Sequence, residues 1–554
     1  MRRLYAERPT SPFPIVPARP GAVALATIMR IFTVPLAFAA LLAVGFAVAC
    51  TPSAAQSEPP FRVEEATIAQ IHAAMKAGRL TCRSLVEDYL HRIDAYDKNG
   101  PALNSIILVN PDALKEADEL DRRFKAGGFV GPLHCVPMIV KDNYQTAGLQ
   151  TTAGSLSLKG FIPDKDAFLV RRVKEAGAIV LAKSNMDEFA FSPYETVSSI
   201  LPGYTHNPYD VYRVTAGSSG GTAAAIAASF GTVGFGTDTG NSIRGPSSHQ
   251  ALVGIRSTMG LTSRAGIVPL NLQADVAGPM ARTVEDAVAV FQVIVGEDPD
   301  DPATKAAQGH PIPDYAKSLV RDGLKGARIG VLRQAWKADT ADPEVMQVFQ
   351  RALDDLQHAG AVIVDPATVQ GLDDIKEPPR SLGPCMGFKY DINRYLAAQG
   401  SRVPVHTLAE IIKSKQFHPS IALRLEQAEA GPENGPDSPA CRAEATYRQR
   451  VRDAVLKTMT DLKLDAFVYP TWSNVPRLIG DLNTPAGDNS QFFSPTTGFP
   501  AINVPMGYTR GGRLPAGMTI YGRPWDEATL IKLAYSYEQA THWRRPPAST
   551  PPLR

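Results

Sequence analysis

Two short turns rich in glycine and serine are the segments of this chain best suited to chemistry. They occupy 217–221 (GSSGG) and 237–242 (TDTGNS), and a run of small residues typical of a helix lies between them. Glycine permits positive φ and close approach of the backbone to a ligand. Backbone N–H groups left bare in such turns can form an oxyanion hole beside a nucleophilic serine. Either turn alone could be an ordinary glycine turn packed against a helix. The presence of two such turns close together favours a site for acyl transfer.

One lysine could supply the base that such a serine needs. Lys141 follows the apolar run 135–140 (CVPMIV), which is typical of a buried strand. A buried ammonium group is costly unless it loses its proton, and a neutral lysine can activate a serine. The alternative is a structural lysine that pairs with Asp142 or extends to solvent.

Eight segments together resemble the amidase signature family. They are GPLHCVPMIVKDN (131–143), LAKSNMDEFA (181–190), AGSSGGTAA (216–224), GTDTGNSIR (236–244), GLTSRAGIVPL (260–270), AGPMARTVEDA (277–287), TGFPAINVPMG (497–507) and GRPWDEATL (522–530). The resemblance is dense over 61–305, good over 460–546 and weak between them. It implies an α/β fold with a single large mixed β-sheet covered by helices on both faces.

The resemblance also implies a Ser–Ser–Lys triad that needs neither metal nor cofactor. Ser242 would be the nucleophile, Ser218, held by a cis peptide, the proton bridge, and Lys141 the base. The oxyanion hole would consist of the backbone N–H groups of Thr239, Gly240, Asn241 and Ser242. Many family members have glycine where Asn241 stands, so its side chain is expected to narrow the acyl pocket or add a polar contact.

The implied reaction is hydrolysis of a carboxylic amide through an acyl-enzyme, with esters and carbamates as further candidate substrates. Asp238 and Arg244 flank the nucleophile and are expected to hold the turn rather than touch substrate. The segments 277–287 and 388–395 most resemble peptide amidases, so a small-molecule or extended peptide amide is the expected substrate. The stretches 191–213 and 377–441 are expected to set its identity.

Other functions explain fewer of these residues. The turn at 217–221 also satisfies GxSxG, with Ser219 as an α/β-hydrolase nucleophile, but Lys141 and Ser242 would then be unexplained. No serine has a lysine three residues on, which excludes the SxxK enzymes of the penicillin-binding type. Two alternatives stay open: the amidotransferase A-type subunit that supplies ammonia for charging transfer RNA, and a non-catalytic surface lipoprotein that binds an amide or peptide.

The elements that must position these residues alternate along the chain, which favours a sheet with helices on both faces. Helices are expected at 81–93, 166–176, 283–295, 343–358 and 526–540, and strands at 135–140, 178–182, 328–332, 361–364, 465–469 and 501–505. Residues 61–546 are interpreted as one amidase domain, with 377–441 as an inserted helical lobe and 547–554 as a C-terminal tail.

The N-terminus has the pattern of an export signal. Met29 and Arg30 precede the apolar run 31–49, and Cys50 follows at once. This order is typical of a secretory signal, and the end of the run resembles a lipobox in which Cys50 is lipidated. The expected location is therefore periplasmic or membrane-anchored; ordinary cleavage and a retained anchor helix are the alternatives. Residues 1–50 would be extension and signal, and 51–60 a tether.

The composition and the cysteine spacing argue against a nucleic-acid partner and against a metal site. The 554 residues include 57 Lys and Arg against 55 Asp and Glu, which gives no electrostatic case for a nucleic-acid partner. The four cysteines after Cys50 show no metal-ligand spacing, and buried free thiols are the expectation, although export would permit disulfides. They are Cys82, Cys135, Cys385 and Cys441. The oligomeric state is open.

Overall fold

The computed structural model describes residues 61–553. The expected signal, Cys50 and the tether therefore lie outside the described residues. The described residues all belong to one compact unit, Pro60–Arg554. None of the helices in the described part is long and apolar enough to cross a membrane.

Eleven strands form one mixed sheet, in the order β1-β3-β2-β6-β8-β7-β12-β13-β11-β9-β10. Their bounds are β1 Ile106–Val109, β2 Pro137–Lys141, β3 Ile179–Ser184, β6 Val233–Asp238, β7 Val253–Arg256, β8 Val276–Ala281, β9 Arg328–Val331, β10 Val362–Val364, β11 Ala466–Pro470, β12 Ala501–Thr509 and β13 Leu514–Tyr521. β2 runs parallel to both β3 and β6, whereas β6 is antiparallel to β8. A separate ribbon pairs β4 (His206–Asn207) with β5 (Asp210–Val214).

Helices cover both faces of this sheet, as predicted. Because successive side chains of a strand point to opposite faces, Met138 and Val140 of β2 pack into one hydrophobic core and Ile139 into another. The first core is completed by α4 (Phe168–Glu175), α7 (Val284–Ile294), α8 (Pro343–His358) and α14 (Glu527–Thr541). The second is completed by α1 (Ile68–Lys76), α2 (Cys82–Ile93), α3 (Ala113–Gly127) and α5 (Gly220–Ala227).

Local signals place several of these elements where the sequence predicts them. The Thr81 side chain caps α2 by accepting from the backbone of Ser84, and Asp342 caps α8, which starts at Pro343. The strand expected at 135–140 instead begins at Pro137 and includes Lys141. It starts later because Cys135 has a φ of 55°, which belongs to a turn and not to a strand.

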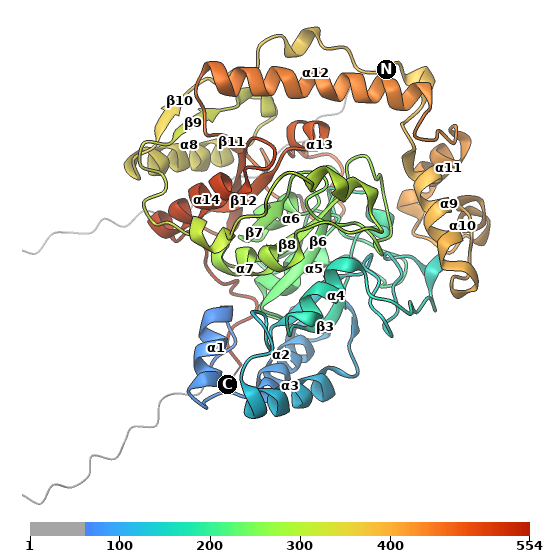
Figure 1. Cartoon of the computed structure of the whole chain (residues 1–554), viewed down its shortest axis with the longest axis vertical. Coiled ribbons are helices and arrows are strands. Elements are labelled where there is room, and N and C mark those ends of the chain that lie inside the picture. The colour runs from blue at the N-terminus through green and yellow to red at the C-terminus, as the bar shows by residue number, and fades with distance from the viewer. Residues whose placement is uncertain (1–60, 554) are drawn as a thin grey trace, which may run out of the picture. The chain divides into compact units, whose positions relative to one another are not determined.

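Three helices between residues 387 and 430, here called the lobe, pack into a hydrophobic core that they share with the segments 153–161 and 186–190 and with Val268. They are α9 (Gly387–Gln399), α10 (Leu408–Ser414) and α11 (Ala422–Ala430), which gather together in Figure 1. Phe388 of α9 contacts Phe189 and Phe191 edge to face, so the lobe packs against the segment that follows β3. The long helix α12 (Pro439–Asp461) comes after the lobe in the chain.

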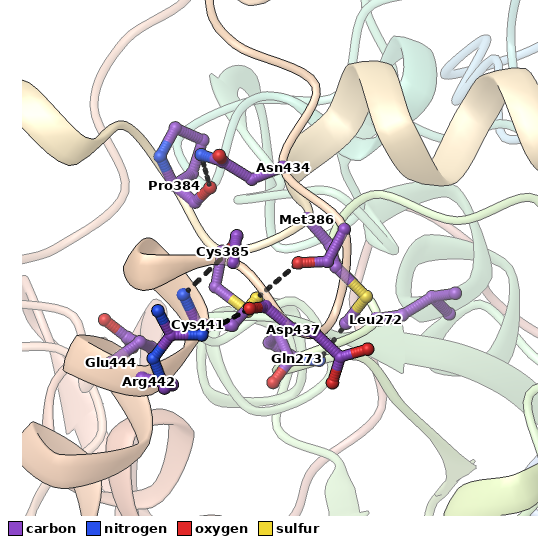
Figure 2. The surroundings of a disulfide bond; sticks show 12 residues. Leu272, Gln273, Pro384, Cys385, Met386, Asn434, Asp437, Cys441, Arg442 and Glu444 are labelled. Atoms are coloured by element: carbon purple, nitrogen blue, oxygen red, sulfur yellow. Dashed lines mark hydrogen bonds between the residues drawn. A yellow bond between two sulfur atoms is a disulfide. The ribbon is translucent and has the colours of Figure 1, made fainter.

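The expectation of four free thiols is wrong, because the cysteines form two disulfides. Cys82, the first residue of α2, bonds to Cys135 in the turn before β2. Cys385, which precedes the lobe, bonds to Cys441 in the first turn of α12 (Figure 2). Their partners lie 53 and 56 residues apart in sequence, and only the packing of the elements brings each pair together.

Hydrogen bonds hold the C-terminal tail against the helix α2. The buried Arg92 of α2 donates hydrogen bonds to the backbone carbonyls of Thr550 and Pro551, at 2.9 and 3.0 Å. The hydroxyl of Ser549 donates to the carbonyl of Pro208. The last residues of the described chain therefore pack beside α2, close in space to its first helices.

Candidate active site

Lys141 stands at the end of β2, on the same face as Ile139 and the helix α5. Its side chain is fully buried. The Nζ atom donates to three hydroxyl groups, at 2.7 Å from Ser218 Oγ, 2.9 Å from Ser219 Oγ and 2.8 Å from Thr237 Oγ1. The structure thus brings Lys141 and Ser218, two of the three predicted triad members, into direct contact.

Burial sets the charge of this lysine. It lowers the pKa of Lys141 to about 7, although Asp275, Asp238 and Asp187 oppose the change through their charges. No carboxylate forms an ion pair with Nζ within residues 61–553. A large fraction of the amine is therefore neutral at physiological pH.

The alternative interpretation of Lys141 as a structural cation does not fit its surroundings. The neighbouring Asp142 accepts hydrogen bonds from Thr152 and Gly154 and lies 3.6 Å from Lys183 Nζ. Lys183 therefore provides the counter-charge for Asp142. Lys141 neither pairs with Asp142 nor reaches solvent.

The turn at 217–221 presents its two serines differently. The Ser219 hydroxyl donates to the carbonyl of Thr237 at 3.2 Å and accepts from Lys141 and from the backbone N–H of Thr237, so its hydrogen-bonding capacity is filled. The Ser218 hydroxyl accepts from Lys141 only, among the described contacts, and its hydrogen remains available. The peptide bond between Gly217 and Ser218 is cis.

Glycine is required at the first position of this turn. A Cβ on Gly217 would overlap the carbonyl oxygens of Ser192 and Glu195, and the Gly217 N–H donates to the Pro193 carbonyl at 2.8 Å. The segment 192–195 therefore lies directly over the turn. Any larger residue would push the two apart and displace Ser218.

Ser242 comes after β6 and before α6 (Arg244–His249), where it lines a pocket of about 330 Å³ together with Thr239, Gly240 and Asn241. Ser242 is 5% exposed, whereas Ser219 is completely buried. The backbone N–H groups of Gly240, Asn241 and Ser242 have no acceptor within the described part of the chain. Bare N–H groups beside a reachable hydroxyl are what an oxyanion hole requires.

Asp238 and Arg244 hold this second turn through buried ion pairs. Asp238 lies 3.1 Å from Arg244 Nε and 3.1 Å from Arg256 NH1, and all three side chains are buried. Its carboxylate also accepts from the backbone N–H of Ile243 at 3.2 Å. Burial raises the pKa of Asp238, but the two guanidinium groups outweigh it, so the net pKa lies below the usual range. Neither Asp238 nor Arg244 lines the pocket.

The sequence did not single out two further residues that contact the lysine site. Thr237 Oγ1 accepts from Lys141 and from Asn143 Nδ2, the latter at 3.1 Å. Thr237 and Asn143 lie inside the segments 236–244 and 131–143, which resemble the family. This resemblance was the only feature of the sequence that could have pointed to them. The Asn241 amide, expected to add a polar contact, is buried with both its nitrogen and its oxygen unpartnered among the described residues.

A family model, curated relatives and a solved structure were compared with this chain, and all are amidases or related amidotransferase subunits. The model of the Amidase family matches residues 84–531. A probable amidase of Arabidopsis thaliana is 34% identical over 88% of this chain and 92% of its own. The A-type subunit of a Synechococcus glutamyl-tRNA(Gln) amidotransferase is 32% identical over 88% of this chain and 94% of its own. The crystal structure of a peptide amidase from Stenotrophomonas maltophilia superposes with a TM-score of 0.77 at 38% identity, covering 87% of this chain and 98% of that one.

Proposed function

Because this chain belongs to the amidase signature family and is an amidase, we propose that it hydrolyses carboxylic amides with Ser242 as nucleophile, Ser218 as proton bridge and Lys141 as base. The observation that carries these assignments is the buried Lys141, whose Nζ lies 2.7 Å from Ser218 Oγ without any carboxylate partner among the described residues. A neutral amine in that position can accept a proton from a serine.

Acylation begins when neutral Lys141 takes the proton of Ser218, which in turn takes the proton of Ser242. The freed Oγ of Ser242 attacks the amide carbon, and the carbonyl oxygen becomes an oxyanion facing the backbone N–H groups of 239–242. As the tetrahedral intermediate collapses, the C–N bond breaks and the proton returns through Ser218 to the departing amine. Water then attacks the acyl-enzyme along the same relay and releases the acid.

We infer that the substrates include the C-terminal amides of peptides. The support is the similarity to the peptide amidase, which extends over almost the whole of that protein. The pocket beside Ser242 is lined by aromatic and apolar groups such as Phe191, Tyr194 and Pro495, which suit an extended chain better than a small polar amide. Ester and carbamate hydrolysis would proceed by the same steps.

The nucleophile can be identified with a fluorophosphonate probe and peptide mass spectrometry of the labelled protein. Wild-type protein should be labelled on Ser242, and Ser242→Ala should not be labelled at all. Ser219→Ala is the matched control: it removes a contact of Lys141 but should leave Ser242 labelled and a measurable rate of ammonia release. Labelling on Ser219 would instead assign the chemistry to the first turn and overturn the proposed relay.

We further propose that the protein is exported and held at the membrane through lipidated Cys50. The sequence pattern at 29–50 motivates this proposal, and the two disulfides support it, since disulfides persist mainly in oxidising compartments.

A further inference from the structure

One charged side chain faces the pocket that contains Ser242. Among the described residues that line this pocket, Arg424 alone carries a charge; the others are apolar, aromatic or neutral polar groups. Arg424 belongs to α11 of the lobe and is exposed. Its NH1 donates to the backbone carbonyl of Phe191, another residue of the pocket wall. That hydrogen bond holds the guanidinium at the pocket while leaving its other N–H groups free.

The charge of Arg424 is not compensated by the protein. Arg424 forms no ion pair within residues 61–553. Asp187 is near enough for the two groups to interact, but it is buried, and burial raises its pKa well above the usual value against the opposing effect of Arg424. Asp187 forms no ion pair with Arg424 among residues 61–553, and one of its carboxyl oxygens accepts from the backbone N–H of Ser192. A positive charge without a partner therefore stands at the wall of the pocket.

We propose that Arg424 makes the enzyme select amides whose acyl part carries a carboxylate, such as peptide amides with an acidic side chain. A guanidinium presents several N–H donors in a planar arrangement that matches a carboxylate. When a primary amide is cleaved, the leaving group is ammonia, so the carboxylate must lie on the acyl part. This inference rests on the proposed hydrolysis of peptide amides and names the substrate class of the same site.

The test uses pairs of acetylated tripeptide amides that differ only by Glu or Gln at one of the three positions. Ammonia release gives kcat/KM for each peptide, and the Glu-to-Gln ratio is taken within one enzyme preparation, so the fraction of folded enzyme cancels. Hydrogen bonds to charged groups are strong enough that we expect wild type to favour Glu about tenfold at one position. The ratio should fall to about one in Arg424→Met, reverse in Arg424→Glu, and survive in part in Arg424→Lys.

Arg394→Met is the matched control. Arg394 lies in α9 of the same lobe and is exposed, but its guanidinium stacks on Tyr390 at 4.1 Å and it does not line the pocket. Its substitution should leave both rate and ratio unchanged. A wild-type ratio of one at all three positions, a ratio that survives in Arg424→Met, or an equal loss in Arg394→Met would each overturn the inference. Absence of ammonia from every peptide would instead overturn the proposed function, and this inference with it.

Discussion

The hydroxyl groups around Lys141 suit the proposed role of this side chain as base in both halves of the reaction. Three neutral oxygens surround Nζ at 2.7 to 2.9 Å, and none of them fixes the amine as an ammonium group, as a carboxylate would. The N-terminus of α5 begins immediately after Ser219 and adds a partial positive charge nearby, which also disfavours the ammonium form.

The acylation rate of the wild-type protein should rise with pH through one ionisation near 7 and then level off. Only the neutral amine accepts a proton, and burial lowers the pKa of Lys141 to about 7, so the amine is protonated and inactive below that value. Rapid-mixing measurements of acyl-enzyme formation across the range from mildly acidic to mildly alkaline pH would check this profile.

Substitutions of Lys141 provide the control for that profile. Lys141→Ala should lose several orders of magnitude in rate, and Lys141→Arg should not restore it, because a guanidinium keeps its proton throughout this range. Each variant must first give the circular dichroism spectrum of the wild type. Wild-type acylation by a folded Lys141→Arg protein would make Lys141 a structural cation.

The burial of Lys141 should also make the free energy of unfolding depend on pH. In the unfolded chain Lys141 holds its proton up to the ordinary value of 10.5, but in the folded protein only up to about 7. Between these values the unfolded state binds more protons, so stability rises with pH; below about 7 the full cost of burying the amine is present. The difference in unfolding free energy, wild type minus Lys141→Met, should therefore increase as the pH is raised from about 7 towards 10.5.

Denaturant titrations of the two proteins measure this difference. Other buried groups, such as Lys183 with its pKa lowered to about 8, contribute equally to both proteins and cancel. A pH-independent difference would mean that Lys141 is charged in the folded state.

The family resemblance and the order of its segments predicted that Ser218 contacts Lys141, and the two lie 2.7 Å apart, but Ser219 was not expected beside this lysine. Thr237 was not predicted either, because a threonine near the end of a strand is ordinary for a strand and carries no signal of its own. Its importance comes from β6 lying beside β2, which is a property of the sheet order.

Elements with strong local signals were predicted well, and those fixed by long-range packing were not. The helices α2 and α8 have capping residues and apolar positions at helical spacing, and both agree with prediction. The long helix α12 did not stand out, because most of its residues are polar and few are buried. The disulfides escaped prediction for a related reason: sequence spacing does not reveal which helix packs on which turn.

The disulfide between Cys385 and Cys441 should matter for substrate binding as well as stability. It closes the loop that contains the lobe, and Gln273 contacts Met386 beside it (Figure 2). The neighbouring residue Leu272 donates to Asp391 of α9 at 2.9 Å. The lobe is thereby tied to the loop whose residues Leu270 and Asn271 line the pocket.

Replacing both cysteines of this disulfide by serine should lower the free energy of unfolding by on the order of 4 kcal/mol, the entropy of closing such a loop. It should also raise KM for peptide amides several-fold more than it lowers kcat, since Lys141 and Ser242 are positioned by the sheet. Denaturant titration and steady-state kinetics would measure the two effects.

The disulfide between Cys82 and Cys135 is the matched control, since its partners are 53 residues apart against 56. Its removal should cost a similar free energy without changing KM, because it joins α2 to the turn before β2, away from the pocket. An equal rise of KM in both variants would show that lobe attachment does not govern substrate binding.

For the molecule as a whole, the expected N-terminus is a lipidated Cys50. The apolar run ends directly before this residue, so the mature chain should begin there, and Cys50→Ala should leave an unprocessed precursor. Mass spectrometry of the membrane fraction, with and without the substitution, measures both. Native protein that retains Met1 or Met29 would contradict this prediction.

The order of strands in the sheet also has a consequence for the time at which the enzyme becomes active. Every residue of the proposed relay lies before the end of β8, in strands and turns that neighbour one another. The strands β9, β10 and β11 join that part of the sheet only through β12 and β13, which are made near the end of synthesis. The pocket residues Gln491 and Pro495 are made just before them. A growing chain on the ribosome therefore holds the proposed nucleophile long before it has a complete pocket.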